Sequence, residues 1–214
     1  MSQANSGLVP GRDKQSVKSS VLLTGATGFI GRRLLPRLVL AGFRVRCLVR
    51  SKQRFRSLFP DMDSVEVVNG DVRDRGALDQ AMQNVSSALY LIHSMEGGPF
   101  QARSFAREDK KAAQAFVNAA EAAGVERIIY LGGLGERGQN LSRHLASRQE
   151  VGNILGSGRP GLTILRAAVI VGSGGASYEI IRSLVDRLPV IVGPRWLNTL
   201  CQPIAADNVV DYLV

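Results

Sequence analysis

The sequence predicts an α/β fold built on a doubly wound, mostly parallel β-sheet. Short apolar runs typical of buried strands alternate with longer stretches in which apolar residues have helical spacing. Strands that are joined through helices pair in parallel, and their crossovers are right-handed. A turn with three glycines, residues 24–31, follows the first strand and opens into a helix, as in a Rossmann sheet. At 214 residues, the chain is long enough for one such domain.

The elements are expected in a regular order. Residues 1–18 lack periodicity and are expected to form a loose arm before a single domain, residues 19–214. Strands are expected at 21–24, 44–49, 65–68, 88–92, 127–131 and 163–167. Helices are expected at 29–41, 76–82, 102–123 and 141–155, with a short basic helix before residue 60 and another from about 178. Residues 207–214 have helical spacing and no stop signal, so we expect a C-terminal truncation.

Composition limits the class of protein. The net charge is +9, and the basic residues are concentrated in residues 1–60, where Asp13 is the single acid. Such a segment could attract nucleic acid or an anionic membrane, or form a solvated helix face and a cofactor pocket. No aromatic residues are interleaved with the basic ones in a stacking pattern, which disfavours nucleic-acid binding. No apolar run approaches the roughly 18–20 residues of a membrane span.

Two cysteines, Cys47 and Cys201, lie among apolar neighbours. We expect both to be buried free thiols in a reducing compartment, rather than a disulfide. The N-terminus has no signal-peptide core. These features predict a cytoplasmic protein.

The glycine-rich turn is the predicted cofactor site. Glycines allow a sharp turn and a close approach of the backbone to phosphate, and the helix N-terminus offers free N–H groups and partial positive charge. A dinucleotide pyrophosphate is the expected ligand. The residues expected to bind it are Gly25, Ala26, Thr27, Gly28, Phe29, Ile30 and Gly31.

The end of the second strand indicates which dinucleotide is preferred. Proteins that prefer NAD usually place an acid about 20 residues after the glycines, where it binds the ribose 2′-hydroxyl. This chain has no acid between Asp13 and Asp61, and instead places Arg50 and Ser51 after the strand. A guanidinium pairs well with a 2′-phosphate, so the sequence predicts NADP(H) in preference to NAD(H). The alternative is that Arg50 is a solvated surface residue.

Several motifs in the same order resemble the extended and atypical short-chain dehydrogenase/reductases. The glycine turn is joined by residues 70–74 (Gly-Asp-Val-Arg-Asp), 119–125 (Ala-Ala-Glu-Ala-Ala-Gly-Val) and 202–204 (Gln-Pro-Ile). The nearest likeness is to NAD(P)-binding proteins of the NmrA-like or sugar-nucleotide-epimerase-like group. The family includes reductases, epimerases, dehydratases and catalytically silent redox sensors, so the resemblance is specific for fold and not for reaction.

The resemblance implies further cofactor contacts. Asp71 and Val72 would lie along the adenine, unless Asp71 is only a loop cap. Residues after the fourth strand would border the cofactor ribose, and residues after the sixth would pack near the nicotinamide. These two groups are Leu91, Ile92 and His93, and Ala167, Ala168 and Val169. His93 could face the substrate or be a satisfied polar residue at a strand end.

The catalytic signature of the family is altered in this chain. Active members have a Ser or Thr after the fifth strand and a Tyr-x-x-x-Lys pair on the next helix, which move a proton to or from a substrate oxygen. Here Gly132 and Gly133 follow Tyr130, which we expect in the core, and the helix has His144 and Arg148 at the pair's spacing. His144 could act as the general acid and Arg148 could hold the ribose. Alternatively, His144 is a surface residue one turn from Arg148.

Two functional classes therefore remain open. One is an NADP(H)-dependent oxidoreductase or epimerase-like enzyme that acts on an unknown small molecule. The other is a non-catalytic redox sensor or assembly factor whose cofactor controls contact with a protein partner. The segment 172–177 is equally a substrate-side lid or a flexible joint. Two distant histidines without a cluster of Cys or carboxylates give no expectation of a metal site.

Overall fold

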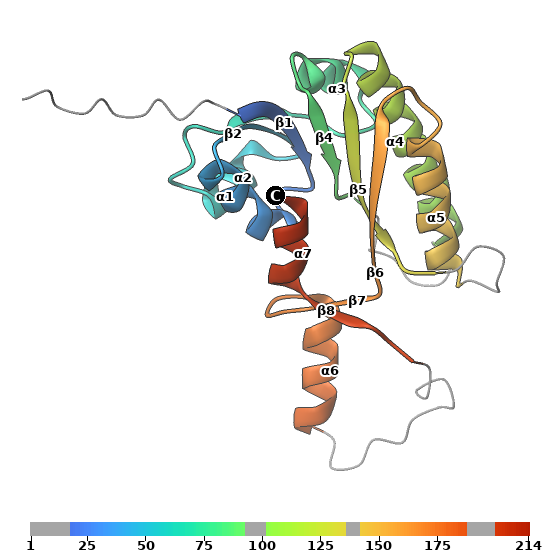
Figure 1. Cartoon of the computed structure of the whole chain (residues 1–214). Coiled ribbons are helices and arrows are strands. Elements are labelled where there is room, and N and C mark those ends of the chain that lie inside the picture. The colour runs from blue at the N-terminus through green and yellow to red at the C-terminus, as the bar shows by residue number, and fades with distance from the viewer. Residues whose placement is uncertain (1–17, 93–101, 136–141, 188–199) are drawn as a thin grey trace, which may run out of the picture.

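A parallel β-sheet forms the centre of the structure, a computed structural model that describes residues 18–92, 102–135, 142–187 and 200–214. Its six strands follow the order β3-β2-β1-β4-β5-β6 (Figure 1). The chain fills one half of the sheet with its first three strands and crosses to the other half for the rest, so the order reverses between β1 and β4. The strands are β1 Lys18–Thr24, β2 Phe43–Val49, β3 Glu66–Asn69, β4 Ser87–Tyr90, β5 Arg127–Gly133 and β6 Gly161–Ala167.

Helices cover both faces of the sheet. The helices α3, α4 and α5 pack on one face, and α1, α2 and α7 pack on the other. Helix α6 extends away from the sheet (Figure 1). The helices are α1 Gly31–Leu40, α2 Lys52–Leu58, α3 Arg75–Met82, α4 Ala102–Ala122, α5 Arg143–Leu155, α6 Ala176–Arg187 and α7 Ala206–Leu213.

The two central strands, β1 and β4, are buried on both faces, and their successive side chains divide between two cores. On β1, Leu22 packs with α3, α4 and α5, whereas Val21 and Leu23 pack with α1, α2 and α7. Strands covered on both faces read as continuous apolar runs, which is why the sequence indicated them clearly. Helix starts are set by polar caps: the Ser51, Asp74 and Ser142 side chains accept hydrogen bonds from the first-turn N–H groups of α2, α3 and α5.

The predicted α/β architecture is confirmed, and the six expected strands and their connecting helices are present with shifts of a few residues at their ends. A second sheet was not predicted: β7 Val169–Val171 pairs in parallel with β8 Pro203–Ala205. Strands of three residues are too short to show periodicity. Of the predicted arm, only Lys18 lies within the described residues, where it begins β1.

The cysteines correct one expectation. Cys47 is buried in β2, as expected, but Cys201 is exposed, so the prediction that both thiols are buried was wrong. Apolar neighbours in the sequence predicted burial, but Cys201 lies just before the short β8 and outside both cores. Burial raises the pKa of the Cys47 thiol, which keeps it protonated and unreactive.

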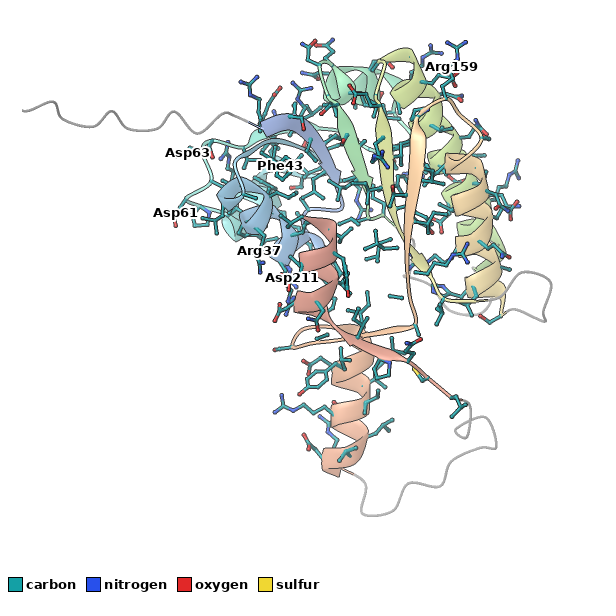
Figure 2. All side chains as sticks on the ribbon, viewed as in Figure 1. Arg37, Phe43, Asp61, Asp63, Arg159 and Asp211 are labelled. Atoms are coloured by element: carbon teal, nitrogen blue, oxygen red, sulfur yellow. The ribbon has the colours of Figure 1, made fainter. Side chains whose placement is uncertain are left out.

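Acids from later in the chain neutralise part of the basic segment. Arg37 on α1 and Asp211 on α7 point toward each other (Figure 2), with Nη2 and Oδ1 separated by 2.6 Å. Arg46 on β2 binds Glu66 on β3 at 2.8 Å and also donates to the carbonyls that end α3. Part of the positive charge of residues 1–60 is therefore used in contacts within the fold.

Candidate functional site

The glycine-rich turn lies at the point where the strand order reverses. Gly25 directly follows β1 and has a φ of +76°, and a Cβ atom there would lie 2.9 Å from the carbonyl oxygen of Leu91, which follows β4. Thr24 holds the two strands together because its buried hydroxyl donates to the Leu89 carbonyl at 2.9 Å. Parallel sheets bind ligands at this crevice, beyond the carboxyl ends of the strands.

The start of α1 is pressed against the same turn. A Cβ atom on Gly31 would lie 2.1 Å from the Gly25 carbonyl oxygen, and one on Gly28 would lie 3.1 Å from it. Ala26 and Ile30 are buried beneath the turn, while Gly28 is exposed. The three glycines therefore allow the helix N-terminus to approach the end of β1 at a distance that side chains would prevent.

The helix end fits an anionic group. No side chain caps α1, and its first turn has no acid that would compete with a phosphate. The partial positive charge of a helix N-terminus attracts a pyrophosphate. The N–H groups of Gly28, Arg32 and Arg33 already donate to backbone carbonyls of the same turn. The shape and charge of the turn are compatible with the dinucleotide site that the sequence predicts at residues 25–31.

The ends of β2 and β3 form the adjacent part of the site. Arg50 is exposed directly after β2, and Ser51 is the capping residue of α2. The Asp71 carboxylate accepts hydrogen bonds from Arg73 Nε at 2.8 Å and from the Arg73 backbone N–H at 3.0 Å. These bonds stabilise the loop that follows β3. The Arg73 hydrogen bonds lower the pKa of Asp71, and the nearby charge of Arg50 contributes. Val72 is buried in the core.

A contact that the sequence did not indicate covers the outer side of the turn. The Phe29 ring fits against Gly172 and Gly175, where Cβ atoms would lie 3.2 and 2.8 Å from its tip. Arg33 stacks on the same ring, 4.4 Å from its centroid, and donates to the carbonyl oxygen of Ser173 at 2.6 Å. The segment after β7 is thus packed onto the cofactor turn, which places it as a covering segment rather than a loose joint.

The remaining predicted cofactor residues lie at the same edge of the sheet. Leu91 and Ile92 follow β4 and are partly buried, whereas His93 lies outside the described residues. Ala167 ends β6 and accepts a hydrogen bond from Leu134 N at 2.9 Å. The exposed Ala168 links β6 to β7, which begins at Val169.

The altered catalytic pair lies on the first two turns of α5. His144 lies at the protein surface. Incomplete hydration of its ring and the positive charge of Arg148 lower its pKa, so the neutral imidazole is favoured at neutral pH. Arg148 points beneath the end of β5, where Nη1 donates to the Leu131 carbonyl at 3.4 Å. Tyr130 is in the core, as expected, with its hydroxyl donating to the Arg148 carbonyl at 3.2 Å. The Ser147 hydroxyl is buried without a hydrogen-bond partner among the described residues.

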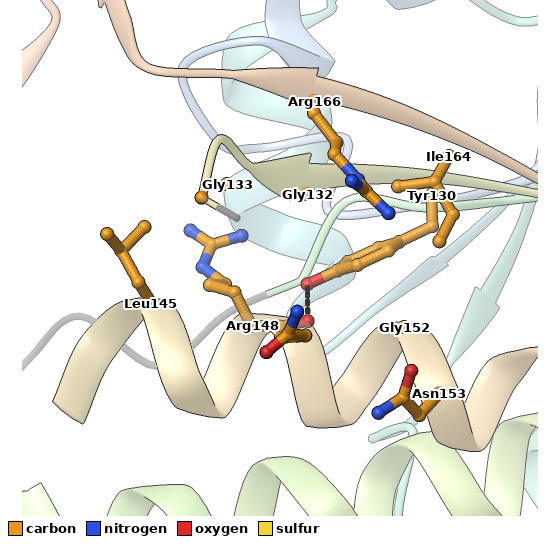
Figure 3. Close-up of a pocket in the computed structure, with 11 residues that line it drawn as sticks. Tyr130, Gly132, Gly133, Leu145, Arg148, Gly152, Asn153, Ile164 and Arg166 are labelled. Atoms are coloured by element: carbon orange, nitrogen blue, oxygen red, sulfur yellow. Dashed lines mark hydrogen bonds between the residues drawn. The ribbon is translucent and has the colours of Figure 1, made fainter. Parts of the chain in front are cut away.

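A small pocket of about 30 Å³ lies between the sheet and α5 (Figure 3). Arg148 enters it from the helix, beyond the hydroxyl end of Tyr130, and Arg166 enters from β6, next to the Tyr130 ring. Arg166 was missed by the sequence analysis. The available signal was a charged residue near the end of an otherwise apolar strand.

Known proteins with similar sequences identify the family of this chain. Residues 25–183 match the model of an NAD(P)H-binding family. The chain belongs to this family. It is 33% identical over 171 residues to the ceramide reductase of Caulobacter vibrioides, covering 80% of this chain and 52% of that protein. It is also 29% identical over 126 residues to the photosystem II assembly factor Ycf39 of Guillardia theta, covering 59% and 38% of the two chains.

A solved structure supports the fold. The enzyme WbmG of Bordetella bronchiseptica, crystallised with NAD, matches with a TM-score of 0.73 and 16% identity over 96% of this chain and 69% of that one. The predicted resemblance to the extended short-chain dehydrogenase/reductases is therefore confirmed. The chain spans about half the length of the ceramide reductase that it matches. No helix in the described part of the chain is long and apolar enough to cross a membrane.

Proposed function

We propose that this NAD(P)H-binding protein prefers NADP(H) and acts as the cofactor-binding part of a carbonyl reductase in the cytoplasm. The observation that carries the preference is Arg50, which is exposed at the carboxyl end of β2, a strand without an acidic residue, and whose charge also acts on Asp71 after β3. A 2′-phosphate would gain a charge-assisted, bidentate partner there. The likeness to a ceramide reductase, and to further relatives named as reductases, supports the reaction class.

The proposed chemistry assigns roles to the chain's own residues. When bound, the nicotinamide supplies the hydride, and the turn of residues 25–31 holds the pyrophosphate by its N–H groups. His144 is the candidate donor of a proton to the substrate oxygen. Because Arg148 and partial burial lower the pKa of His144, proton donation from the imidazolium is favoured by acid and is lost as pH rises. Arg148 lies one turn away and supplies fixed positive charge.

The cofactor preference is tested by calorimetry with NADPH and NADH. NADPH should bind at least about tenfold more tightly, equivalent to about 1.4 kcal/mol, and Arg50→Ala should remove most of that difference. The matched control is Arg75→Ala, because Arg75 is an exposed arginine at the start of α3 that pairs within its own helix with Asp79. Equal affinities of the parent protein for the two cofactors would refute the preference.

A second function is favoured by the loss of the Tyr-x-x-x-Lys pair and by the likeness to the Ycf39 assembly factor. In this case the chain is a non-catalytic sensor or assembly factor whose NADP(H) occupancy controls contact with a partner. Single-turnover oxidation of bound NADPH with a panel of carbonyls and enones separates the two. Turnover with any member supports the reductase. Complete inactivity, together with a partner whose binding depends on cofactor, supports the second function.

A further inference from the structure

We propose that the pocket between β5, β6 and α5 binds the anionic group, a carboxylate or a phosphate, of the protein's substrate. The proposal rests on the proposed reductase function and adds a substrate class to it. The pocket is separate from the glycine-rich turn, and its charged groups come from two different elements, Arg148 from α5 and Arg166 from β6.

Strand register brings Arg166 into the pocket. Tyr130 pairs with Ile164 and Gly132 pairs with Arg166 across β5 and β6. Residues two apart on a strand share a face, so all four lie on the α5 side of the sheet. Gly132 has no side chain, and Figure 3 shows the Arg166 guanidinium directed over this part of the sheet toward the pocket.

The two guanidinium groups have unused hydrogen-bonding capacity. Nε of Arg148 is buried and has no hydrogen-bond partner among the described residues, and its Nη1 makes only the long 3.4 Å contact with Leu131. Arg166 is exposed, and its side chain forms no hydrogen bond or ion pair with any residue that the structure describes. A buried charged donor without a partner is unfavourable, so an acceptor that reached Nε of Arg148 would be bound favourably.

Charge and size define the ligand. None of the described residues that line the pocket is acidic, and the other polar side chains are the amides of Gln149 and Asn153. One water molecule needs roughly 10–15 Å³ of free volume in a cavity. The pocket, at about 30 Å³, therefore has room for a group of two or three oxygens. The two arginines in the lining select an anion of that size, which a planar guanidinium binds through paired hydrogen bonds. Asp109 on α4 acts electrostatically on Tyr130 and His144 and offsets part of this positive charge.

The location connects the pocket with the proposed reaction. Gly133 ends β5 at the same edge of the sheet as the glycine-rich turn, and His144 lies one turn before the pocket residue Arg148 on the same face of α5. A substrate anchored by its anion would therefore have its remaining atoms beside the candidate proton donor. An anchor that does not react contributes by positioning the substrate.

The test is a site-resolved titration of the ¹⁵N-labelled protein by NMR. Inorganic phosphate and acetate are added in separate arms, each with and without saturating NADP⁺, and the amide signals of Gly132, Gly133 and Gly152 report on the pocket. The Gly28 amide reports on the cofactor turn, which phosphate should also occupy when NADP⁺ is absent. We expect saturable shifts at the pocket glycines that persist with NADP⁺ bound, and a dissociation constant at least tenfold weaker in Arg166→Gln.

Arg182→Gln is the matched control, because Arg182 is an exposed arginine on α6 that pairs with Asp186. It should leave the pocket titration unchanged. Saturation by phosphate alone or by acetate alone identifies which anion the site takes. The proposal is overturned if the pocket signals do not shift, shift without saturating, or respond equally in Arg166→Gln and the parent. Failure of NADPH to bind while the pocket signals still saturate would refute the proposed function and leave the anion site standing.

Discussion

Gly31→Ala is the sharpest single test of the cofactor turn. The added methyl group would lie 2.1 Å from the Gly25 carbonyl oxygen and 2.8 Å from Ala26 Cα. Both are backbone atoms, so no side-chain rotation can relieve the overlap. To reach an ordinary contact of 3.4 Å, the start of α1 must move away from the end of β1 by about 1.3 Å.

This displacement should lower both stability and cofactor affinity. Overpacking at a well-packed site costs about 1–3 kcal/mol. In a domain of this size each kcal/mol lowers Tm by roughly 2–4 °C, so we expect a fall of about 2–12 °C by calorimetry. The N–H groups that face the pyrophosphate move with the helix, so NADPH should bind at least about tenfold more weakly.

The control is Gly76→Ala, at the start of α3. There a Cβ atom would meet only the Asp74 carboxylate at 3.5 Å, an ordinary contact. Its NADPH affinity should match that of the parent protein. Its Tm should be equal or slightly higher, since Gly→Ala at a compatible site stabilises by about 0.4–1 kcal/mol. A Gly31→Ala protein that melts and binds NADPH like the parent would refute the reasoning entirely. One that melts early but binds normally would refute only the role of the turn in holding the cofactor.

Three further outcomes are expected. Thr24→Val removes the buried hydrogen bond to the Leu89 carbonyl on β4 and should lower the free energy of unfolding, measured by urea denaturation, by about 1–2 kcal/mol; an unchanged midpoint would contradict this. A thiol reagent should modify Cys201 in the folded protein and Cys47 only after unfolding, so rapid labelling of both in native buffer would be inconsistent with the fold. The imidazole of His144 should titrate below its ordinary pKa of 6.5 in NMR spectra. Arg148→Gln should raise that midpoint because it removes a like charge. A midpoint above 6.5 in the parent protein would contradict this prediction.

The candidate site was predictable in part. The glycine turn could be identified from the sequence because its chemistry resides in consecutive backbone groups. The spacing of Gly31 from the other two glycines is enough to indicate its role in the turn. Arg166 could not be identified in this way, since its role depends on its register opposite Gly132 on a strand more than thirty residues earlier. The contact between Phe29 and Gly175 depends equally on where the chain returns after β7. Each of these is a long-range packing relation, which the neighbouring residues in the sequence do not specify.

The sequence by itself determined the fold class, the order of the main strands and helices, and the place of the dinucleotide turn. Those properties follow from local periodicity and from glycine spacing, which act within a few residues. The tertiary structure decided the outcome for Cys201, the neutralisation of Arg37 by Asp211, and the meeting of Arg148 with Arg166 in one pocket. These depend on contacts between distant segments, because burial and electrostatic environment are properties of the packed chain and not of neighbours in sequence.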